Sequence, residues 1–403
     1  MLSQMVRELA ICFYLLVFKC LFSIFSLWPL RNKTTFVVSF GDNTQYVYKE
    51  ILRQHIPTDM VFLCEQKAFP KFKDVQEATT ILFEAKHLIN WMQAVFHLAT
   101  SRRIFIDNYF GFLAAVSFKK EVKCIQLWHA SGAMKKFGLE DESIKSRTDR
   151  ARERFLQVYS KFDRVVVGSD VMTEIFMKSF HLKKENILPT GVPRTDFFYN
   201  KEAKQKAIDT LLHQHPSLRD KKIILYAPTY RDHELEHFNL VLEVEKMARE
   251  LGQDYRLILR LHPAIVHKED FAATRSSDFV VDLSSSQYDI NELLVAADYL
   301  ITDYSSIPYD FSLLHKPMIF FAYDLDEYKQ QRGVMEGFEE HLPGPLVKDT
   351  ESIIELIQNN RFDISQVEYY SEKWNQYSKG CSSQNLVQYI FTEEWFKAKS
   401  TGY

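Results

Sequence analysis

The chain of 403 residues is poor in the residue types that mark fibrous, disordered and nucleic-acid-binding proteins. Its 12 glycines and 12 prolines argue against collagen-like repeats and long disordered tracts. With 50 basic and 53 acidic residues the formal charge is −3, so the basic balance that usually accompanies nucleic-acid binding is missing. The length exceeds that of an ordinary single domain, and a hydrophobic content of 46% is enough to fill two cores.

Cysteines are few and poorly placed for cross-linking. They are odd in number, far apart and free of CxxC pairs: Cys12, Cys20, Cys64, Cys124 and Cys381. This pattern argues against structural disulfides and a zinc site, and it indicates a reducing cytosol. The GxGxxG fingerprint, the GxxxxGK[ST] loop and the HExxH motif are also missing, so the commonest dinucleotide, NTP and zinc-peptidase sites have no support.

One long apolar run, Leu9–Leu30, lies near the N-terminus and is interrupted by Lys19 and two serines. It is long enough to span a bilayer. However, Lys19 would then lie near the middle of the membrane, at a cost of roughly 2.5–3.5 kcal/mol. A helix in the membrane interface keeps this lysine in water, and Trp28 and Arg31 suit its edge. We therefore expect residues 1–33 to associate with a membrane, with spanning and burial on the protein itself as alternatives.

Beyond this segment, short β-rich runs alternate with helical patterns. The expected strands are nearly continuous apolar runs: 35–39, 59–64, 103–107, 123–128, 164–168, 222–227, 256–261, 279–282, 299–302 and 317–321. The expected helices between them are 45–54, 86–99, 149–160, 237–251, 289–296 and 305–314. Such alternation predicts an α/β protein with parallel sheets covered on both faces.

Gly191 and Pro193 break the pattern and give the best boundary signal. We therefore expect two doubly wound domains, residues 34–192 and 193–403, the second including the C-terminal helices. Domains of this kind bind ligands at the carboxyl ends of their strands, so we expect the two to face a shared cleft.

Two histidines follow apolar runs. His129 comes directly after Trp128 and precedes Ser131 and Gly132, whose small size lets a substrate approach the backbone. A histidine there can take a proton from an attacking hydroxyl, although a buried structural histidine is an equal alternative. His262 follows Arg260 on one strand face. The pair could hold a diphosphate, or could simply end the strand.

Other polar residues follow two further strands. Ser305 and Ser306 lie where the strand 299–302 passes into a helix, after Asp303. The N–H groups of a helix start suit a phosphate, but the serines could also be plain helix caps. Thr229 and Arg231 close the strand 222–227 and could reach phosphate or ribose oxygens, or form an ordinary turn. Together these transitions predict phosphoryl or glycosyl transfer from a nucleotide-activated donor.

Taken in order, these segments resemble the CDP-glycerol glycerophosphotransferase family of teichoic acid synthesis. The matching segments are QLWH (126–129), GVPRTD (191–196), YAPTYR (226–231), RLHP (260–263), 289–298, ITDYSS (301–306), KP (316–317), 324–328 and RG (332–333). The resemblance covers roughly 36–340. Ala130 stands where polymerising members typically have glycine, so the chain looks more like the primase branch.

The resemblance implies a GT-B-like fold with two Rossmann-type domains and a peripheral enzyme on the cytoplasmic side of the cell membrane. It implies CDP-glycerol as donor, an undecaprenyl-diphosphate-linked disaccharide as acceptor, and no nucleic acid. No cofactor is implied, and metal dependence stays open. His129 matches the family's proposed base, and His262 is the second expected catalytic residue. The residues expected to bind CDP-glycerol are Trp128, Ser131, Gly132, Arg194, Thr229, Arg231, Arg260, Asp303, Ser305, Ser306 and Arg332. Chain extension with glycerol or ribitol phosphate, and sugar transfer on the same fold, are the alternatives.

Overall fold

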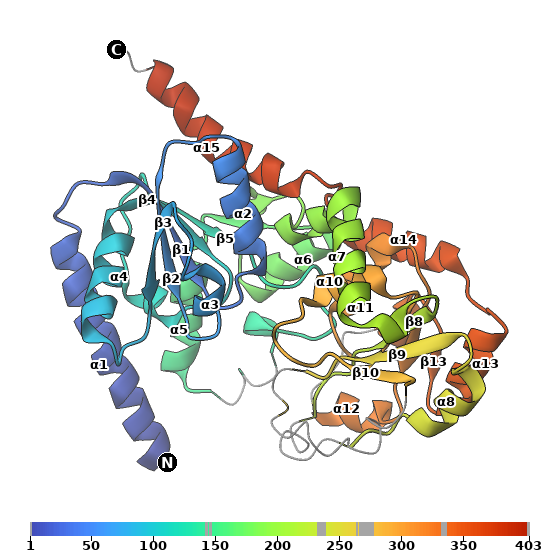
Figure 1. Ribbon diagram of the computed structural model, residues 1–403. Helices are drawn as coiled ribbons and strands as arrows, with labels where there is room; N and C mark the ends of the chain where they lie inside the picture. The colour runs from blue at the N-terminus through green and yellow to red at the C-terminus, as the bar shows by residue number, and fades with distance from the viewer. Residues whose placement is uncertain are drawn as a thin grey trace. The chain divides into compact units, whose positions relative to one another are not determined.

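The computed structural model describes residues 2–141, 144, 147–231, 239–262, 265, 278–331 and 337–400. Contacts divide the chain into two compact units. Unit 1 comprises Met1–Ala130, Phe137–Arg194 and Tyr377–Tyr403, and unit 2 comprises Ser131–Lys136 and Thr195–Gln376. Each is built on one parallel sheet (Figure 1), so the predicted α/β class is confirmed.

Unit 1 is a seven-stranded sheet of order β3-β2-β1-β4-β5-β6-β7. The strands are β1 Arg31–Val38, β2 Asp59–Cys64, β3 Ala78–Leu82, β4 Ser101–Ile106, β5 Lys123–Gln126, β6 Arg164–Val166 and β7 Ile187–Leu188. The helices are α1 Leu2–Phe25, α2 Asp42–Arg53, α3 Phe69–Phe72, α4 Leu88–Thr100, α5 Asp149–Tyr159, α6 Asp170–Ser179 and α15 Ser382–Ser400, with 3₁₀ turns η1 Gly111–Ala115, η2 Gly138–Glu140 and η4 Lys184–Asn186. Strand order reverses between β1 and β4, which places a switch point there.

The core of unit 1 follows from strand register. Phe36 of β1 pairs with Phe62 of β2 and with Phe105 of β4, and the Phe36 ring stacks on both others at 4.9 and 5.2 Å. Helices α2, α3 and α15 cover this face. Because Leu386 and Val387 of α15 are fully buried in this core, the end of the chain belongs to unit 1. The sequence-based assignment of all residues after 192 to the second domain is corrected accordingly.

Unit 2 repeats the same topology with six strands, in the order β10-β9-β8-β11-β12-β13. The strands are β8 Lys222–Tyr226, β9 Tyr255–Leu259, β10 Val280–Asp282, β11 Tyr299–Thr302, β12 Met318–Phe321 and β13 Leu346–Val347. The helices are α7 Lys201–Gln214, α8 Val244–Leu251, α10 Ile290–Ala296, α11 Ile307–Phe311, α12 Leu325–Gln331, α13 Thr350–Gln358 and α14 Ile364–Trp374. The 3₁₀ turns are η5 Pro193–Tyr199, η6 Pro216–Leu218, η9 Ser312–Leu314 and η10 Glu339–His341.

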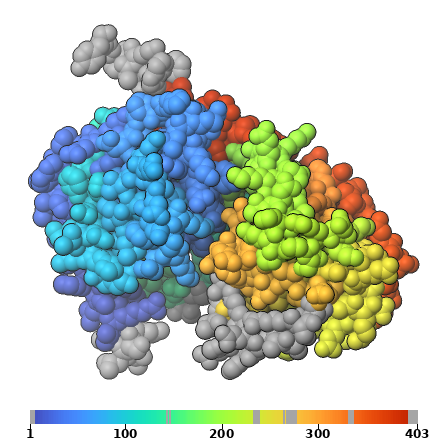
Figure 2. All heavy atoms as spheres, viewed as in Figure 1, coloured from blue at the N-terminus to red at the C-terminus, as the bar shows by residue number. Residues whose placement is uncertain are grey.

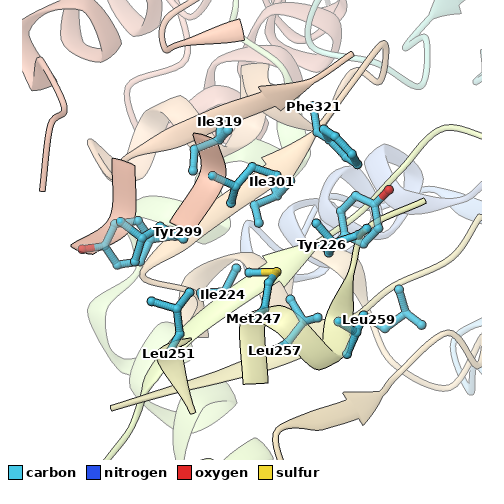
Figure 3. Packing of buried hydrophobic residues seen from close by; sticks show 14 of the residues in the cluster. Ile224, Tyr226, Met247, Leu251, Leu257, Leu259, Tyr299, Ile301, Ile319 and Phe321 are labelled. Atoms are coloured by element: carbon cyan, nitrogen blue, oxygen red, sulfur yellow. The ribbon is translucent and has the colours of Figure 1, made fainter. Parts of the chain in front are cut away.

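Alternate side chains of the unit 2 strands form its core. Ile224, Leu257 and Ile301 lie on one sheet face and pack against Met247 of α8 (Figure 3). Helix α13 covers the same face through Ile353, while α10 lies against β8 and α7. Both faces of the strands are therefore buried, as the continuous apolar runs require.

Helix α1 packs on unit 1 with one face only. Phe18 and Phe22 are buried, and the Phe18 ring stacks on Phe112 at 5.0 Å. The opposite face leaves Phe13 69% and Leu16 60% exposed, and the dark-blue residues of this helix lie on the surface in Figure 2. Within the described residues, one helix is long and apolar enough to cross a membrane, and it is this one.

Candidate active site

In unit 1, the loop after β1 is held by a carboxylate that follows β4. Asp107 accepts hydrogen bonds from three consecutive backbone N–H groups, those of Ser39 (2.9 Å), Phe40 (3.0 Å) and Gly41 (2.8 Å). Gly41 has a φ of +89° and starts helix α2, so its left-handed backbone suits glycine. Burial raises the pKa of Asp107 to about 6, although the three N–H groups oppose this shift. The carboxylate thus fixes the backbone at the switch point of the sheet.

His129 lies at the same edge of the sheet, between two aromatic rings. Its imidazole stacks on Phe40 at 4.3 Å, and the tilted Trp128 ring lies 4.4 Å away. Its Nδ1 atom is buried and has no hydrogen-bond partner in the described part of the chain. Burial lowers the pKa of His129 to about 4, and the charge of Arg194 acts in the same direction. The imidazole is therefore neutral at pH 7 and has a free lone pair or N–H to offer a ligand.

The backbone around His129 is held by contacts from distant segments. Trp128 has a φ of +56°, a conformation that costs roughly 1–3 kcal/mol for a residue with a side chain. Asn43 of α2 stabilises it by donating to the Trp128 carbonyl at 2.8 Å and accepting from the Arg194 N–H at 3.0 Å. Arg194 in turn donates from Nη1 to the His129 carbonyl. The predicted residues Trp128, His129 and Arg194 therefore lie together, with Asn43 joining them.

Ser131 and Gly132 follow His129 closely in the sequence, but their own contacts serve packing within unit 2. Both belong to unit 2 and are buried. Ser131 donates from its hydroxyl to Asp310 Oδ1 at 2.6 Å. A side chain on Gly132 would meet the Tyr309 ring at 2.4 Å, so glycine is needed there for packing. Their small size thus serves close packing on α11, and their predicted contact with CDP-glycerol stays a prediction.

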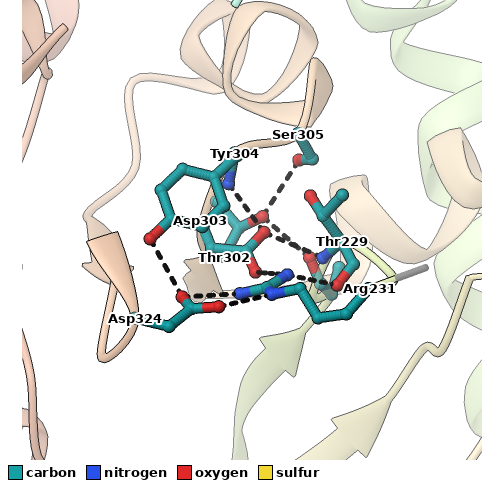
Figure 4. Close-up of polar contacts among 8 residues, drawn as sticks. Thr229, Arg231, Thr302, Asp303, Tyr304, Ser305 and Asp324 are labelled. Carbon is teal, nitrogen blue, oxygen red and sulfur yellow. Dashed lines mark hydrogen bonds and ion pairs between the residues drawn. The ribbon is translucent and has the colours of Figure 1, made fainter. Parts of the chain in front are cut away.

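In unit 2, a buried network joins the loops after β8, β11 and β12 (Figure 4). Asp303 accepts from the backbone N–H of Thr229 at 2.8 Å and from Arg231 Nη1 at 3.0 Å. Arg231 also donates from Nε and Nη2 to Asp324, at 2.6 and 2.9 Å. The arginine side chain is 4% exposed. Breaking such a buried pair costs about 3–5 kcal/mol, so these residues fix the loops relative to one another.

Tyrosines enclose the Arg231 guanidinium, whose carbon lies 5.2 Å from the Tyr304 ring centre and 5.0 Å from that of Tyr328. These two rings stack on each other at 3.8 Å, and the Tyr304 hydroxyl donates to Asp324 at 3.0 Å. The Arg231 guanidinium is therefore buried, and its hydrogen bonds go to groups of the protein. Its predicted contact with phosphate remains untested, and the geometry gives Arg231 and Asp303 a positioning role.

The two serines differ in their surroundings. The Ser305 hydroxyl is 3.0 Å from that of Thr302 and accepts from the Ile307 N–H at 3.3 Å, so Ser305 caps the start of α11. Ser306 precedes the first residue of α11, and its hydroxyl has no hydrogen-bond partner among the described residues. Both are only partly buried. The hydroxyl available to a ligand is therefore that of Ser306.

Two further predicted residues follow β9. His262 is exposed, and its ring lies 4.6 Å from that of Tyr230. Arg260 donates to the carbonyls of Leu283 (2.7 Å) and Tyr288 (3.0 Å), so it ties β9 to the next loop rather than standing open. Arg332 lies outside the described residues. Those described contain no group of three His, Cys, Asp or Glu side chains that could hold a metal ion.

Sequence reasoning missed Asn43, Asp107 and the ring of Phe40. Asp107 does follow an apolar run, which is the signal that could have found it. Phe40 and Asn43 also come just after a strand, but their neighbours in the fold are 65 or more residues away in the sequence.

Comparison with known proteins assigns the chain to a family. Residues 20–392 match the model described as CDP-glycerol:poly(glycerophosphate) glycerophosphotransferase. The chain is 40% identical over 360 residues to the teichoic acid glycerol-phosphate primase of Bacillus subtilis strain 168, with 89% of this chain and 92% of that protein covered. It is 36% identical to the enzyme of the same name from Bacillus spizizenii, with 94% and 97% covered.

Solved structures support the same fold. The wall teichoic acid polymerase TagF superposes with a TM-score of 0.78 at 23% identity, covering 98% of both chains. A UDP-GlcNAc 2-epimerase from Neisseria meningitidis superposes with a TM-score of 0.58 at 13% identity, covering 89% of this chain and 100% of that one. The family match and the identity to these relatives show that the chain belongs to the CDP-glycerol glycerophosphotransferase family and is a transferase of teichoic acid synthesis.

Proposed function

We propose that this enzyme performs the priming step of wall teichoic acid synthesis. It transfers glycerol phosphate from CDP-glycerol to an undecaprenyl-diphosphate-linked N-acetylmannosaminyl-N-acetylglucosamine acceptor and releases CMP. Support comes from the relatives, because two glycerol-phosphate primases are 40% and 36% identical to the chain. A ribitol-phosphate primase is 34% identical, and polymerases that use ribitol or glycerol phosphate are 27–31% identical.

The observation that carries the chemistry is the neutral, stacked His129 with its unpartnered Nδ1. In the proposed reaction a hydroxyl of the acceptor sugar passes its proton to His129 as its oxygen attacks the phosphorus that bears glycerol. The new O–P bond forms while the bond from that phosphorus to the CMP oxygen breaks. The negative charge of a bound donor would raise the pKa of His129 from its low value, which makes the imidazole a better base only when substrate is present.

In the same proposal unit 2 holds the donor. Ser306, whose hydroxyl has no partner among the described residues, donates to a phosphate oxygen. Arg231, Asp303 and Asp324 keep the loops after β8, β11 and β12 in place. His262 is exposed in the loop after β9, and its ring lies 4.6 Å from that of Tyr230. In this proposal it assists the departure of CMP. Donor groups fixed in advance in this way stabilise the charge that develops on the phosphates.

We further propose that the enzyme works on the cytoplasmic face of the cell membrane. Helix α1 presents an apolar face, including Phe13 and Leu16, while its other face is part of unit 1. A helix with one face packed on the protein and one exposed apolar face suits the membrane interface. If α1 crossed the bilayer instead, Phe18 and Phe22 would lose their contacts with unit 1. Exposed Lys19 would stay in contact with water or lipid head groups.

A single reconstitution tests the proposed function. The purified full chain is incubated with CDP-glycerol and the lipid-linked disaccharide, and CMP release and product mass are followed. One added glycerol phosphate supports priming. Many added units would identify a polymerase, transfer from CDP-ribitol but not CDP-glycerol would identify a ribitol enzyme, and UDP release from UDP-sugars would identify a glycosyltransferase. Parallel reactions with EDTA and with Mg²⁺ establish whether a metal is needed.

A further inference from the structure

Unit 1 contains a cavity at the carboxyl ends of β2 and β3 that the proposed chemistry does not use. It has a volume of about 420 Å³ and is bordered by α1, α4, α5 and η1. This size lies within the range of small-molecule sites. Its apolar wall includes Tyr14, Trp91 and Phe112, and Trp91 donates to the Tyr14 hydroxyl at 3.4 Å. The cavity is therefore lined on one side by the inner face of the apolar N-terminal helix.

The charged lining of this cavity is unbalanced. The lining residues include three arginines, Arg7, Arg147 and Arg154, and one carboxylate, that of Glu65. Arg154 is held by Glu8 through two parallel hydrogen bonds of 2.7 and 2.9 Å. Arg7 and Arg147 form no ion pair with any described residue. The Arg147 guanidinium instead lies over the Phe155 ring at 5.3 Å.

An anion with several oxygens would satisfy these groups, because arginine binds phosphate through charge-assisted hydrogen bonds. The apolar surroundings require that the anion be attached to something hydrophobic. The outer face of α1 carries exposed apolar side chains at positions 6, 9, 13 and 16, on the helix whose inner face lines the cavity. An amphiphile with a phosphate head and a long apolar chain has both properties.

The cavity is also connected to His129 through a short segment. Asp107 accepts the N–H of Phe40, whose ring stacks on the His129 imidazole, and Tyr109, two residues after Asp107, lines the cavity. Consecutive Cα atoms are about 3.8 Å apart, so the Tyr109 Cα lies within about 7.6 Å of the Asp107 Cα. In the proposed acceptor, two sugars separate the lipid diphosphate from the hydroxyl that reacts.

We propose that this cavity binds the diphosphate of the lipid-linked acceptor, with Arg7 and Arg147 pairing with its oxygens and the prenyl chain leaving along α1. The proposal rests on the proposed function, since it assigns that acceptor's lipid phosphate to a site. The phosphate of a bilayer phospholipid has the same chemistry, and the test separates the two sources. Binding of the diphosphate would direct the sugars toward His129 and set how far the active site lies from the membrane.

The test measures binding to the full chain by calorimetry, with farnesyl diphosphate as the probe. The variant is Arg7→Gln with Arg147→Gln, which should fold because both side chains are exposed. We expect at least about tenfold weaker binding, since charge-assisted hydrogen bonds are lost. Arg150→Gln, which replaces an exposed arginine of α5 that does not line the cavity, should bind as wild type does. Farnesol, which lacks the diphosphate, should bind weakly and equally to all three proteins.

Equal affinity of wild type and the double variant for farnesyl diphosphate would overturn the proposal. A second result would also overturn it: dihexanoyl phosphatidylglycerol binds wild type as tightly as farnesyl diphosphate does, and the double variant loses both affinities equally. The site would then hold a bilayer lipid. In turnover, the double variant should raise the KM for the lipid-linked acceptor about tenfold and leave the KM for CDP-glycerol unchanged. Because binding is measured without transfer, a failure of the priming reaction would be distinguishable from a failure of this site.

Discussion

Asp107 and Asp303 occupy the same topological position in two different sheets. Each follows the strand beyond the switch point, β4 in unit 1 and β11 in unit 2, and each accepts backbone N–H groups from the loop after the strand beside it. In unit 1 the loop so held carries Phe40, which stacks on His129. In unit 2 it carries Arg231. One structural device therefore fixes the candidate site residues in both units.

Replacing Asp107 by asparagine should weaken this device. The amide has only one acceptor oxygen and turns an NH₂ toward backbone donors, so we expect a loss of about 1–3 kcal/mol in the free energy of unfolding. Displacement of Phe40 should also lower transfer. Urea denaturation and CMP release measure the two effects. Asp163→Asn is the control, because the Asp163 carboxylate accepts the Cys124 N–H at the amino ends of the strands. This substitution should leave transfer largely intact.

His129→Ala should abolish most of the transfer while the protein stays folded. General-base assistance is worth roughly 10²–10⁴ in rate, and the alanine variant should lose that factor in kcat. CMP release gives the rate, and the thermal midpoint reports the fold. His213→Ala, at an exposed position of α7, should behave as wild type. Near-normal turnover in a folded His129→Ala protein would remove this residue from the mechanism.

The low pKa of His129 also predicts how stability depends on pH. The folded value is about 4 and the ordinary value is 6.5, so the unfolded chain binds more protons between them. The contribution is fully present above pH 6.5 and is lost as the pH falls toward 4. It contributes about 3 kcal/mol to the free energy of unfolding. Urea denaturation at pH 7 and pH 4.5 should show a steeper loss for wild type than for His129→Gln; equal losses would mean that the imidazole titrates normally.

Single replacements should separate the roles of Ser305 and Ser306. Ser305→Ala removes a helix cap and should lower stability by about 1 kcal/mol with a small effect on ligand affinity. Ser306→Ala should keep stability and weaken CDP and CDP-glycerol alike, because the lost hydrogen bond goes to the diphosphate. A loss of about 1.5–3 kcal/mol in binding is expected. Calorimetric titration of both variants with both ligands decides the matter, and unchanged affinity of Ser306→Ala would leave the phosphate site without this hydroxyl.

Helix α1 offers a test of membrane association that spares the fold. Phe13→Glu with Leu16→Glu changes only exposed side chains, and each lost apolar contact is worth about 1.5–3 kcal/mol. We expect the variant to stay in the supernatant when vesicles are sedimented, and its midpoint of thermal unfolding to stay the same. Tyr369→Glu, an equally exposed aromatic residue of unit 2, should sediment normally. Deleting residues 1–31 is a poorer test, since removal of Phe18 and Phe22 uncovers the core around Trp91 and Phe112.

Short edge strands and some helices could not be predicted from pattern alone. The strands β3, β7 and β13 are absent from the predicted ones, because they are edge strands of two to five residues with at most one buried residue each and a weak hydrophobic signal. The helices α3, α6, α7, α12 and α13 are likewise absent from the predicted ones. The pattern did predict the buried central strands, because a strand covered on both faces must be apolar throughout.

The sequence by itself determined the fold class and the strand ends at which polar residues gather, because both depend on local hydrophobic period and on residues close together in the chain. The tertiary structure alone decided which of those residues meet. Asn43 reaches Trp128 across 85 positions and Asp107 reaches Ser39 across 68. It also joined Ser131 to Asp310 across 179 positions, and it placed α15 in the core of unit 1. Such contacts are set by the order of strands in the sheet, which no local pattern encodes.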